Sequence, residues 1–145
     1  MTFASGLRAR NATANGITTL ALLGLMLSSA SAEAAPQIVN VSGATGQSIV
    51  LHSHVRFGDM CGAAAVPELQ ILEQPKHGTV SSRVEPIKLT QPTPGFPAEC
   101  VGKSAPGLTV LYTSTPGYGG QDHILYSVSS QGLPTTTWDV TVEVK

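Results

Sequence analysis

The stretch that decides the fold reads Tyr112-Thr-Ser-Thr-Pro-Gly-Tyr-Gly-Gly-Gln-Asp-His-Ile-Leu-Tyr-Ser-Val128. Apolar and polar side chains alternate at both ends of this stretch, and a segment rich in Pro and Gly lies between them. This is the pattern of two β-strands joined by a turn. Because the side chains of a strand alternate between its faces, we expect Ile124, Tyr126 and Val128 to point into a core. Tyr126 is large enough to fill the space between two sheets, which gives it a structural role.

Two turns are predicted from residues that suit particular backbone conformations. Gly117 and Gly120 favour positive φ between the two strands of this stretch, and Asp122 can accept hydrogen bonds from turn N–H groups. Earlier in the chain, Pro75 fixes its own φ and Gly78 permits positive φ. We therefore assign structural roles in turns to these five residues.

Short alternating runs bounded by Gly, Pro, Ser and Asn continue along the chain, which is the signature of an all-β protein. Strands are expected at residues 38–43, 48–57, 67–73, 79–84, 87–89, 107–113, 124–129 and 137–145. No sequence segment after residue 35 has an apolar face with helical spacing. Seven or eight strands in a chain of this length predict a sandwich of two antiparallel sheets, with a small closed barrel as the alternative.

The strand expected at residues 48–57 shows how faces are assigned. Its odd positions are apolar apart from Ser53, so this face is expected to enter the core. The even positions His52, His54 and Arg56 are then expected to form a solvated polar face. Two histidines at i and i+2 on one face are nevertheless the best metal candidate in the chain.

Candidate residues for cofactors and catalysis are few. His52 and His54 could hold zinc or copper if the fold brought Asp59, Cys61 or His77 close to them. The acidic residues are too scattered for a calcium site. No Gly-x-Ser-x-Gly motif surrounds a nucleophilic serine, and no spacing suggests a catalytic pair of carboxylates. We predict no cofactor, no metal and no enzymatic activity, with a metal-binding protein that uses the two histidines as the alternative.

Residues 1–32 have the parts of a cleaved signal peptide. A basic start is followed by the apolar residues 17–27 and then by Ala30-Ser31-Ala32, which matches the A-x-A cleavage pattern. The apolar run is too short to cross a bilayer as a helix. Cleavage after Ala32 is expected, with Ala34 as the alternative position. Residues 33–145 would then form a single domain in the periplasm or the medium.

The exported part has a small negative charge. The whole chain has eight basic and nine acidic residues; cleavage would remove two arginines and leave six against nine, a formal charge of −3. Because a nucleic-acid partner requires a basic stripe, we expect none. No second apolar run in the sequence is long enough to span a membrane, so no stable span is expected after cleavage.

Cys61 and Cys100 are the two cysteines of the chain, and both lie in the exported part. An even number of cysteines in an oxidising compartment predicts one disulfide, which here would close a loop of about 40 residues. Two free thiols and two metal ligands are the alternatives.

Two motifs resemble those of bacterial Ig-like or cadherin-like domains, which occur in tandem arrays in surface proteins. One is Pro75-Lys-His-Gly-Thr-Val80, and the other runs from Tyr112-Thr113 through Pro116-Gly-Tyr-x-Gly-x-Asp-x-Ile-x-Tyr-x-Val128. The resemblance covers residues 74–128 and, more loosely, the last strand. It implies an Ig-like sandwich that acts as a binding, adhesion or spacer module. The spacing of Asp122, Tyr126 and Val128 also resembles strand F of immunoglobulin domains, which suggests Tyr126 as a tyrosine corner whose hydroxyl holds a turn. The chain departs from the family in having one copy and a pair of cysteines, which suggests a stand-alone variant.

Loops at the ends of a sandwich carry most of the contacts that such modules make. The candidate contact residues are therefore those in or beside the loops, namely His77, Phe96, Tyr118 and His123. The expected partner is a protein or a glycan of the cell envelope. We predict a non-enzymatic binding or structural module of the bacterial envelope.

Overall fold

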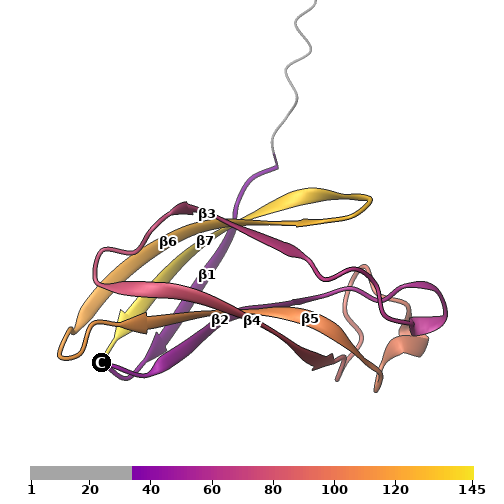
Figure 1. Cartoon of the computed structure of the whole chain (residues 1–145), viewed down its shortest axis with the longest axis horizontal. Coiled ribbons are helices and arrows are strands. Elements are labelled where there is room, and N and C mark those ends of the chain that lie inside the picture. Colours follow the sequence, from indigo (N-terminus) through magenta and orange to yellow (C-terminus); the bar gives the residue numbers. More distant parts are fainter. Residues whose placement is uncertain (1–33) are drawn as a thin grey trace, which may run out of the picture. The chain divides into compact units, whose positions relative to one another are not determined.

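A computed structural model describes residues 34–145, which form seven strands and two short 3-10 helices (Figure 1). The strands are β1 (Gln37–Gly43), β2 (Ser48–Val55), β3 (Glu68–Glu73), β4 (Gly78–Lys88), β5 (Ser104–Ser114), β6 (Gly120–Ser130) and β7 (Leu133–Val144). The 3-10 helices are η1 (Asp59–Cys61) and η2 (Ala98–Cys100). The predicted signal peptide, residues 1–32, lies outside the described residues.

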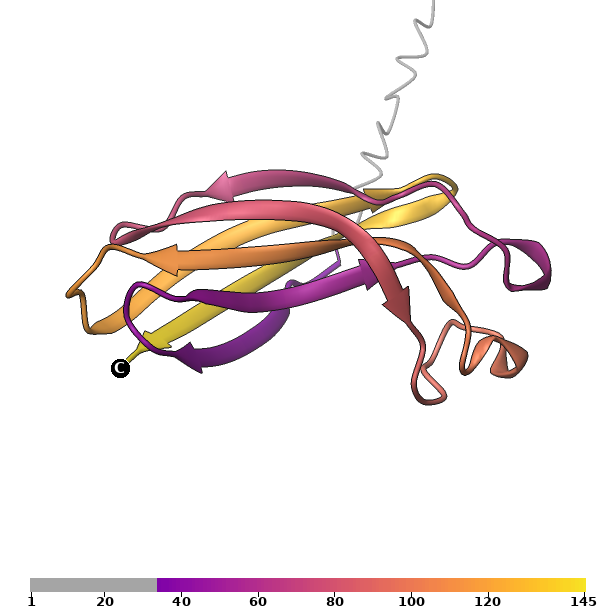
Figure 2. The ribbon, with the colours of Figure 1, turned by 60° about the horizontal axis from the view of Figure 1, so that its bottom comes forward.

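The strands form two sheets, with the orders β1-β7-β6-β3 and β2-β5-β4. Figure 2 shows β2, β5 and β4 side by side in one layer. Neighbouring strands are antiparallel except for β1 and β7, which are parallel. Lettered in chain order, β3, β6 and β7 match the C, F and G strands of an immunoglobulin domain, and β2, β5 and β4 match B, E and D. The predicted Ig-like two-sheet sandwich is therefore confirmed, and the closed barrel is not formed.

β4 is one long strand where the sequence predicts two short ones. The predicted runs 79–84 and 87–89 are continuous because the ladder with β5 passes through Pro86. Proline has no backbone N–H, so a sheet tolerates it at an edge strand. β4 is such an edge, with β5 as its neighbour on one side.

The main core lies between the two sheets and is built from the predicted inward positions. Tyr112, Ile124 and Tyr126 have no exposed surface, and Val140 and Val142 complete the centre of this core. Burying one large apolar side chain contributes about 1.5–3 kcal/mol. The expected inward direction of the alternate residues of β6 and β7 is therefore confirmed.

The predicted faces of β2 hold as far as Leu51, which is buried in the core, and are wrong for His52 and His54. Its pairing with β5 shifts register between Val50 and His52. Such a bulge adds one residue to one strand, so the side chains that follow it exchange faces. His52 and His54 consequently point between the sheets, where His54 contacts Tyr126 of the core. The expected solvated polar face of this strand does not form.

A smaller apolar cluster surrounds the predicted disulfide, which is confirmed by a Cys61–Cys100 Sγ–Sγ distance of 2.06 Å. Cys100 has no exposed surface and packs with Phe57, Leu89 and Ala105. The bond joins η1 to η2 and so fixes two loops at one end of the sandwich (Figure 1). A disulfide is consistent with an oxidising compartment. Within residues 34–145, no helix has the length and hydropathy needed to cross a membrane.

Candidate functional site

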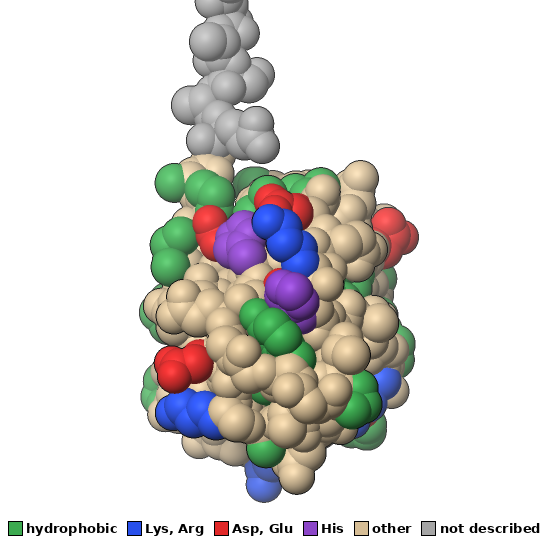
Figure 3. All heavy atoms as spheres, turned by 90° about the vertical axis from the view of Figure 1, so that its left-hand side faces the viewer, with side chains coloured by type: hydrophobic (Ala, Val, Ile, Leu, Met, Phe, Trp, Pro, Cys, Tyr) green, Lys and Arg blue, Asp and Glu red, His purple; other side chains and the backbone are tan. Residues whose placement is uncertain are grey.

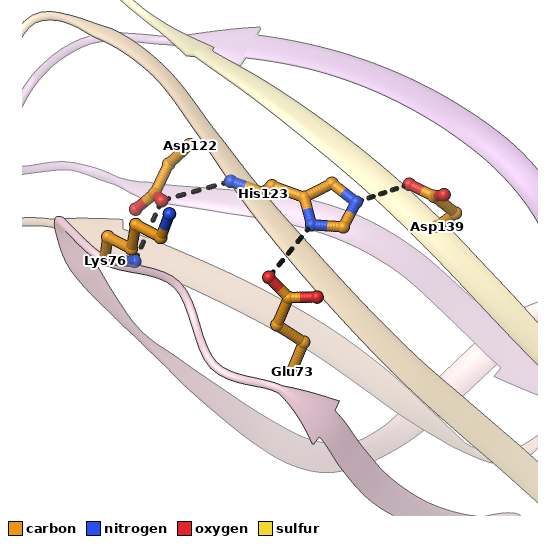
Figure 4. Close-up of polar contacts among 5 residues, drawn as sticks. All are labelled: Glu73, Lys76, Asp122, His123 and Asp139. Carbon is orange, nitrogen blue, oxygen red and sulfur yellow. Dashed lines mark hydrogen bonds and ion pairs between the residues drawn. The ribbon is translucent and has the colours of Figure 1, made fainter.

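One end of the sandwich is closed by hydrogen bonds to Asp122 of β6 (Figure 4). Its carboxylate accepts bonds of 2.8–3.0 Å from the backbone N–H groups of Lys76, His77 and His123. The Tyr112 hydroxyl donates a further bond of 3.0 Å. Burial alone would raise the pKa of Asp122, but these four hydrogen bonds together lower it. Asp122 therefore ties the β3–β4 turn to β5 and β6.

Gly78 is required for space and not for the positive φ that the sequence suggests. Gly117 and Gly120 do adopt positive φ, 81° and 128°, whereas Gly78 is not among the glycines with positive φ. A Cβ at Gly78 would overlap the ring of Tyr112, which crosses the start of β4. The glycine therefore lets an aromatic ring lie against the backbone.

Tyr112, rather than Tyr126, is the tyrosine whose hydroxyl holds a turn. Besides its bond to Asp122, the Tyr112 hydroxyl donates to the carbonyl oxygen of His77 at 3.3 Å. Burial and then the bond to Asp122 raise the pKa of Tyr112. The Tyr126 hydroxyl lies 3.3 Å from Nε2 of His54 instead, near the other end of the sandwich.

Three of the predicted contact residues lie at this closed end. The ring of His77 stacks on that of Tyr118, with centroids 4.2 Å apart and planes at 12°. The Tyr118 hydroxyl donates to the carbonyl oxygen of Gln121 at 2.6 Å. Figure 3 looks at this end and shows histidine side chains beside acidic and basic ones.

His123, the third of these residues, lies between two carboxylates on the outer face of its sheet (Figure 4). Its Nε2 is 2.7 Å from Asp139 Oδ1, and its Nδ1 is 3.7 Å from Glu73 Oε1. The hydrogen bond to Asp139 raises the pKa of His123, and the Glu73 charge adds to this effect. Because both ring nitrogens face carboxylates, the ring acts as an ion-pairing group.

The opposite end of the sandwich is open and holds a groove of about 770 Å³. Its walls come from the end of β2, the segment from Ile87 to Pro97, and the β6–β7 turn. That turn and the disulfide-bonded loops lie at the right-hand end of Figure 1. Phe96, the fourth predicted contact residue, lines the groove and packs edge-on against Phe57 at 5.9 Å. Pockets for small ligands commonly measure about 300–1,000 Å³.

One wall of the groove is an aromatic cluster centred on Trp138. The ring of His52 stacks on it at 4.3 Å, and His54 contacts it edge-on at 5.0 Å. Burial lowers the pKa of His52, and burial followed by the His52 charge lowers the pKa of His54 to about 4. Both histidines are therefore neutral at pH 7, and they offer flat aromatic surface rather than charge.

Two residues that line the groove each have a buried hydrogen-bond donor with no acceptor among residues 34–145. The donors are Arg56 Nη1 and Trp138 Nε1, and both atoms are buried. Leaving a buried donor unsatisfied costs about 1–3 kcal/mol. Native proteins satisfy most such groups, so two unsatisfied donors on residues of one groove set this end apart from the closed end.

The histidines do not assemble the metal site that the sequence allows. Among residues 34–145, no group of three or more His, Cys, Asp or Glu side chains is placed to hold a metal ion. The rings of His52 and His54 are neighbours, 4.8 Å apart, but Cys61 is in the disulfide and His77 stacks on Tyr118 at the other end. The further ligands named from the sequence are therefore not available to them.

Sequence reasoning missed the two residues that distinguish the groove. It places Arg56 on a solvated face and does not single out Trp138 as a contact residue. In the structure both residues line the groove, and Trp138 also packs against the main core. The inward direction of Trp138 could have been predicted, because Trp138 lies on the same face of its strand as Val140 and Val142. For Arg56 no such prediction was possible, because its direction depends on the bulge in β2.

Comparisons with protein-family models, with curated proteins and with solved structures found no match to this chain. Function is therefore inferred from the two ends of the sandwich. The closed end satisfies its own polar groups, whereas the open end keeps two donors free.

Proposed function

We propose that the protein is an exported, non-enzymatic binding module of the cell envelope, and that it takes its ligand into the groove at the open end of the sandwich. The observation that carries this proposal is the groove itself. It measures about 770 Å³ and is lined by aromatic rings and polar donors, in a fold whose other end is tightly packed.

Export is supported by the predicted signal peptide, residues 1–32, and by the Cys61–Cys100 disulfide. The resemblance to bacterial Ig-like and cadherin-like domains supports a binding role, because such domains act mainly as binding, adhesion or spacer modules. Their contacts are usually made by loops at one end of the sandwich, and the groove lies at such an end.

The walls of the groove are held rigidly, which favours binding. The ring of His52 comes from β2 and the ring of Trp138 from β7, and each strand is hydrogen-bonded within its own sheet. The disulfide fixes the loops that bear Phe57 and Phe96. A site that is formed before the ligand arrives loses less conformational entropy on binding.

The proposal is tested by screening a library of small fragments against the ¹⁵N-labelled protein by NMR. The chain has a single tryptophan, so one indole N–H resonance reports directly on the groove. We expect fragments that bind to shift this resonance and the backbone amides of residues 52–57. The amides of His77 and Tyr118, at the closed end, should not move.

A pair of neighbouring variants on β7 provides the control. Thr136 lines the groove and Thr135 does not, so Thr136→Phe should block binding while Thr135→Phe leaves it unchanged. Fragments that bind both variants equally, or that shift the closed end alone, would contradict a groove-binding function.

A further inference from the structure

The charges around the groove are unlike those of the chain as a whole. The chain has nine acidic and eight basic residues, yet the groove lining contains Arg56 and Lys88 and no Asp or Glu. A pocket of one sign attracts ligands of the opposite sign, and the effect is stronger where the walls exclude water. The groove lining therefore has two cationic side chains and no carboxylate.

We propose that the ligand of this groove is a small organic carboxylate with a flat apolar body, whose carboxylate is bound by the guanidinium group of Arg56. This inference rests on the proposed binding function and names the chemical class of its ligand.

Arg56 fits a carboxylate. Its side chain lines the groove, and its buried Nη1 has no acceptor among the described residues. Arg56 also makes no ion pair within residues 34–145. A guanidinium group matches the two oxygens of a carboxylate with parallel N–H bonds, and these charge-assisted bonds are about twice as strong as neutral ones. A carboxylate would thus give Arg56 the ion-pair partner that the described residues do not provide.

The remaining lining suits a flat apolar group. His52 stacks on Trp138 at 4.3 Å, and both rings line the groove together with Phe96, Val128 and Leu133. Burial keeps both histidines of the wall neutral at pH 7, so they do not add a second charged site. Aromatic rings pack favourably in offset-stacked and edge-on arrangements. A planar or short aliphatic body of a small acid therefore fits beside the bound carboxylate.

The proposal is tested with 1-naphthaleneacetate and its neutral amide, 1-naphthaleneacetamide, which share a shape and differ in charge. Affinities are measured by calorimetry and by the shift of the Trp138 indole resonance, on protein purified after expression of the full chain. We expect the acid to bind at least about tenfold more tightly than the amide, because one charge-assisted contact is lost with the amide. Raising the salt concentration should weaken binding of the acid alone.

Variants test whether Arg56 is the residue that binds the carboxylate. Arg56→Met should lower the affinity for the acid about tenfold and leave the affinity for the amide within about twofold, and Arg56→Lys should restore part of the loss. Arg83→Met is the matched control, because Arg83 pairs with Glu85 on an exposed part of β4 and does not line the groove.

The possible results separate the two proposals. Equal affinity for the acid and the amide, with shifts in the groove, would overturn the carboxylate assignment and leave groove binding in place. Binding of a peptide through its free C-terminal carboxylate, without binding of the small acid, would overturn the small-molecule assignment. No binding by either probe or by any fragment would overturn both. If Arg56→Met does not fold, Arg56→Lys and the acid–amide comparison in the wild type still decide the outcome.

Discussion

His54 is a half-buried histidine with aromatic neighbours. Its Nε2 lies 3.3 Å from the Tyr126 hydroxyl, its ring contacts Trp138 edge-on, and His52 lies beside it. Burial favours the neutral imidazole, and burial together with the nearby His52 lowers the pKa of His54 to about 4. Protonation of this ring is therefore coupled to the stability of the fold.

This coupling predicts a loss of stability in mild acid. The unfolded chain has a histidine pKa near 6.5, so between about pH 6.5 and pH 4 the unfolded state binds more protons than the folded state. Stability therefore falls as the pH drops through this window. Each pKa unit corresponds to about 1.4 kcal/mol, and partial exposure of the ring reduces the effect. In urea unfolding, the wild type should lose about 1–3 kcal/mol more than His54→Gln between pH 7 and pH 4.5.

His123→Gln is the control with the opposite sign. The pKa of His123 is raised by Asp139 and then by Glu73, so its contribution is present below pH 6.5 and is lost as the pH rises through the raised pKa. This variant should lose more stability at pH 5 than at pH 8. Parallel pH profiles for wild type and His54→Gln would show that His54 is not buried as described.

At the scale of elements, the start of β4 is locked to β5 by contact between a glycine and an aromatic ring. A side chain at Gly78 would overlap the Tyr112 ring, which in turn bonds to Asp122. This contact explains why residue 78, at the start of β4, must be glycine although the φ angle of Gly78 is not positive.

Gly78→Ala should therefore destabilise the fold by about 1–3 kcal/mol, the usual cost of overpacking a filled site. Gly119→Ala is the matched control, because a Cβ there would lie 3.8 Å from the nearest atom, Val144 O, and the residue does not have positive φ. It should change the free energy of unfolding by no more than about 0.5 kcal/mol. Equal effects of the two substitutions, measured by urea denaturation, would contradict the proposed role of Gly78.

The elements that could be predicted from the sequence are those that depend on local pattern. Alternation in residues 124–128 and 138–144 determines which side chains enter the core, and the structure agrees. The bulge in β2 could not be predicted, because it depends on how β2 pairs with β5. One extra residue moved His52 and His54 from the expected outer face to the space between the sheets.

At the scale of the whole molecule, the two ends of the sandwich differ in whether their buried hydrogen-bond donors have acceptors. Four donors converge on Asp122 at the closed end. At the open end, the disulfide holds the loops that wall the groove, and two buried donors remain free. The sequence predicts the disulfide and the loops, but not the groove, because its size depends on how the two sheets and their loops are spaced. Phe96 is the one predicted contact residue that lies there.

A crystal structure of the protein grown with 1-naphthaleneacetate tests the central claim most directly. We predict the carboxylate of the ligand in the groove, with its oxygens about 2.7–3.2 Å from nitrogens of the Arg56 guanidinium group, and the naphthalene ring against the His52–Trp138 wall. A structure in which Arg56 Nη1 is bonded to an acceptor of its own chain, with the ligand bound elsewhere or not at all, would contradict it.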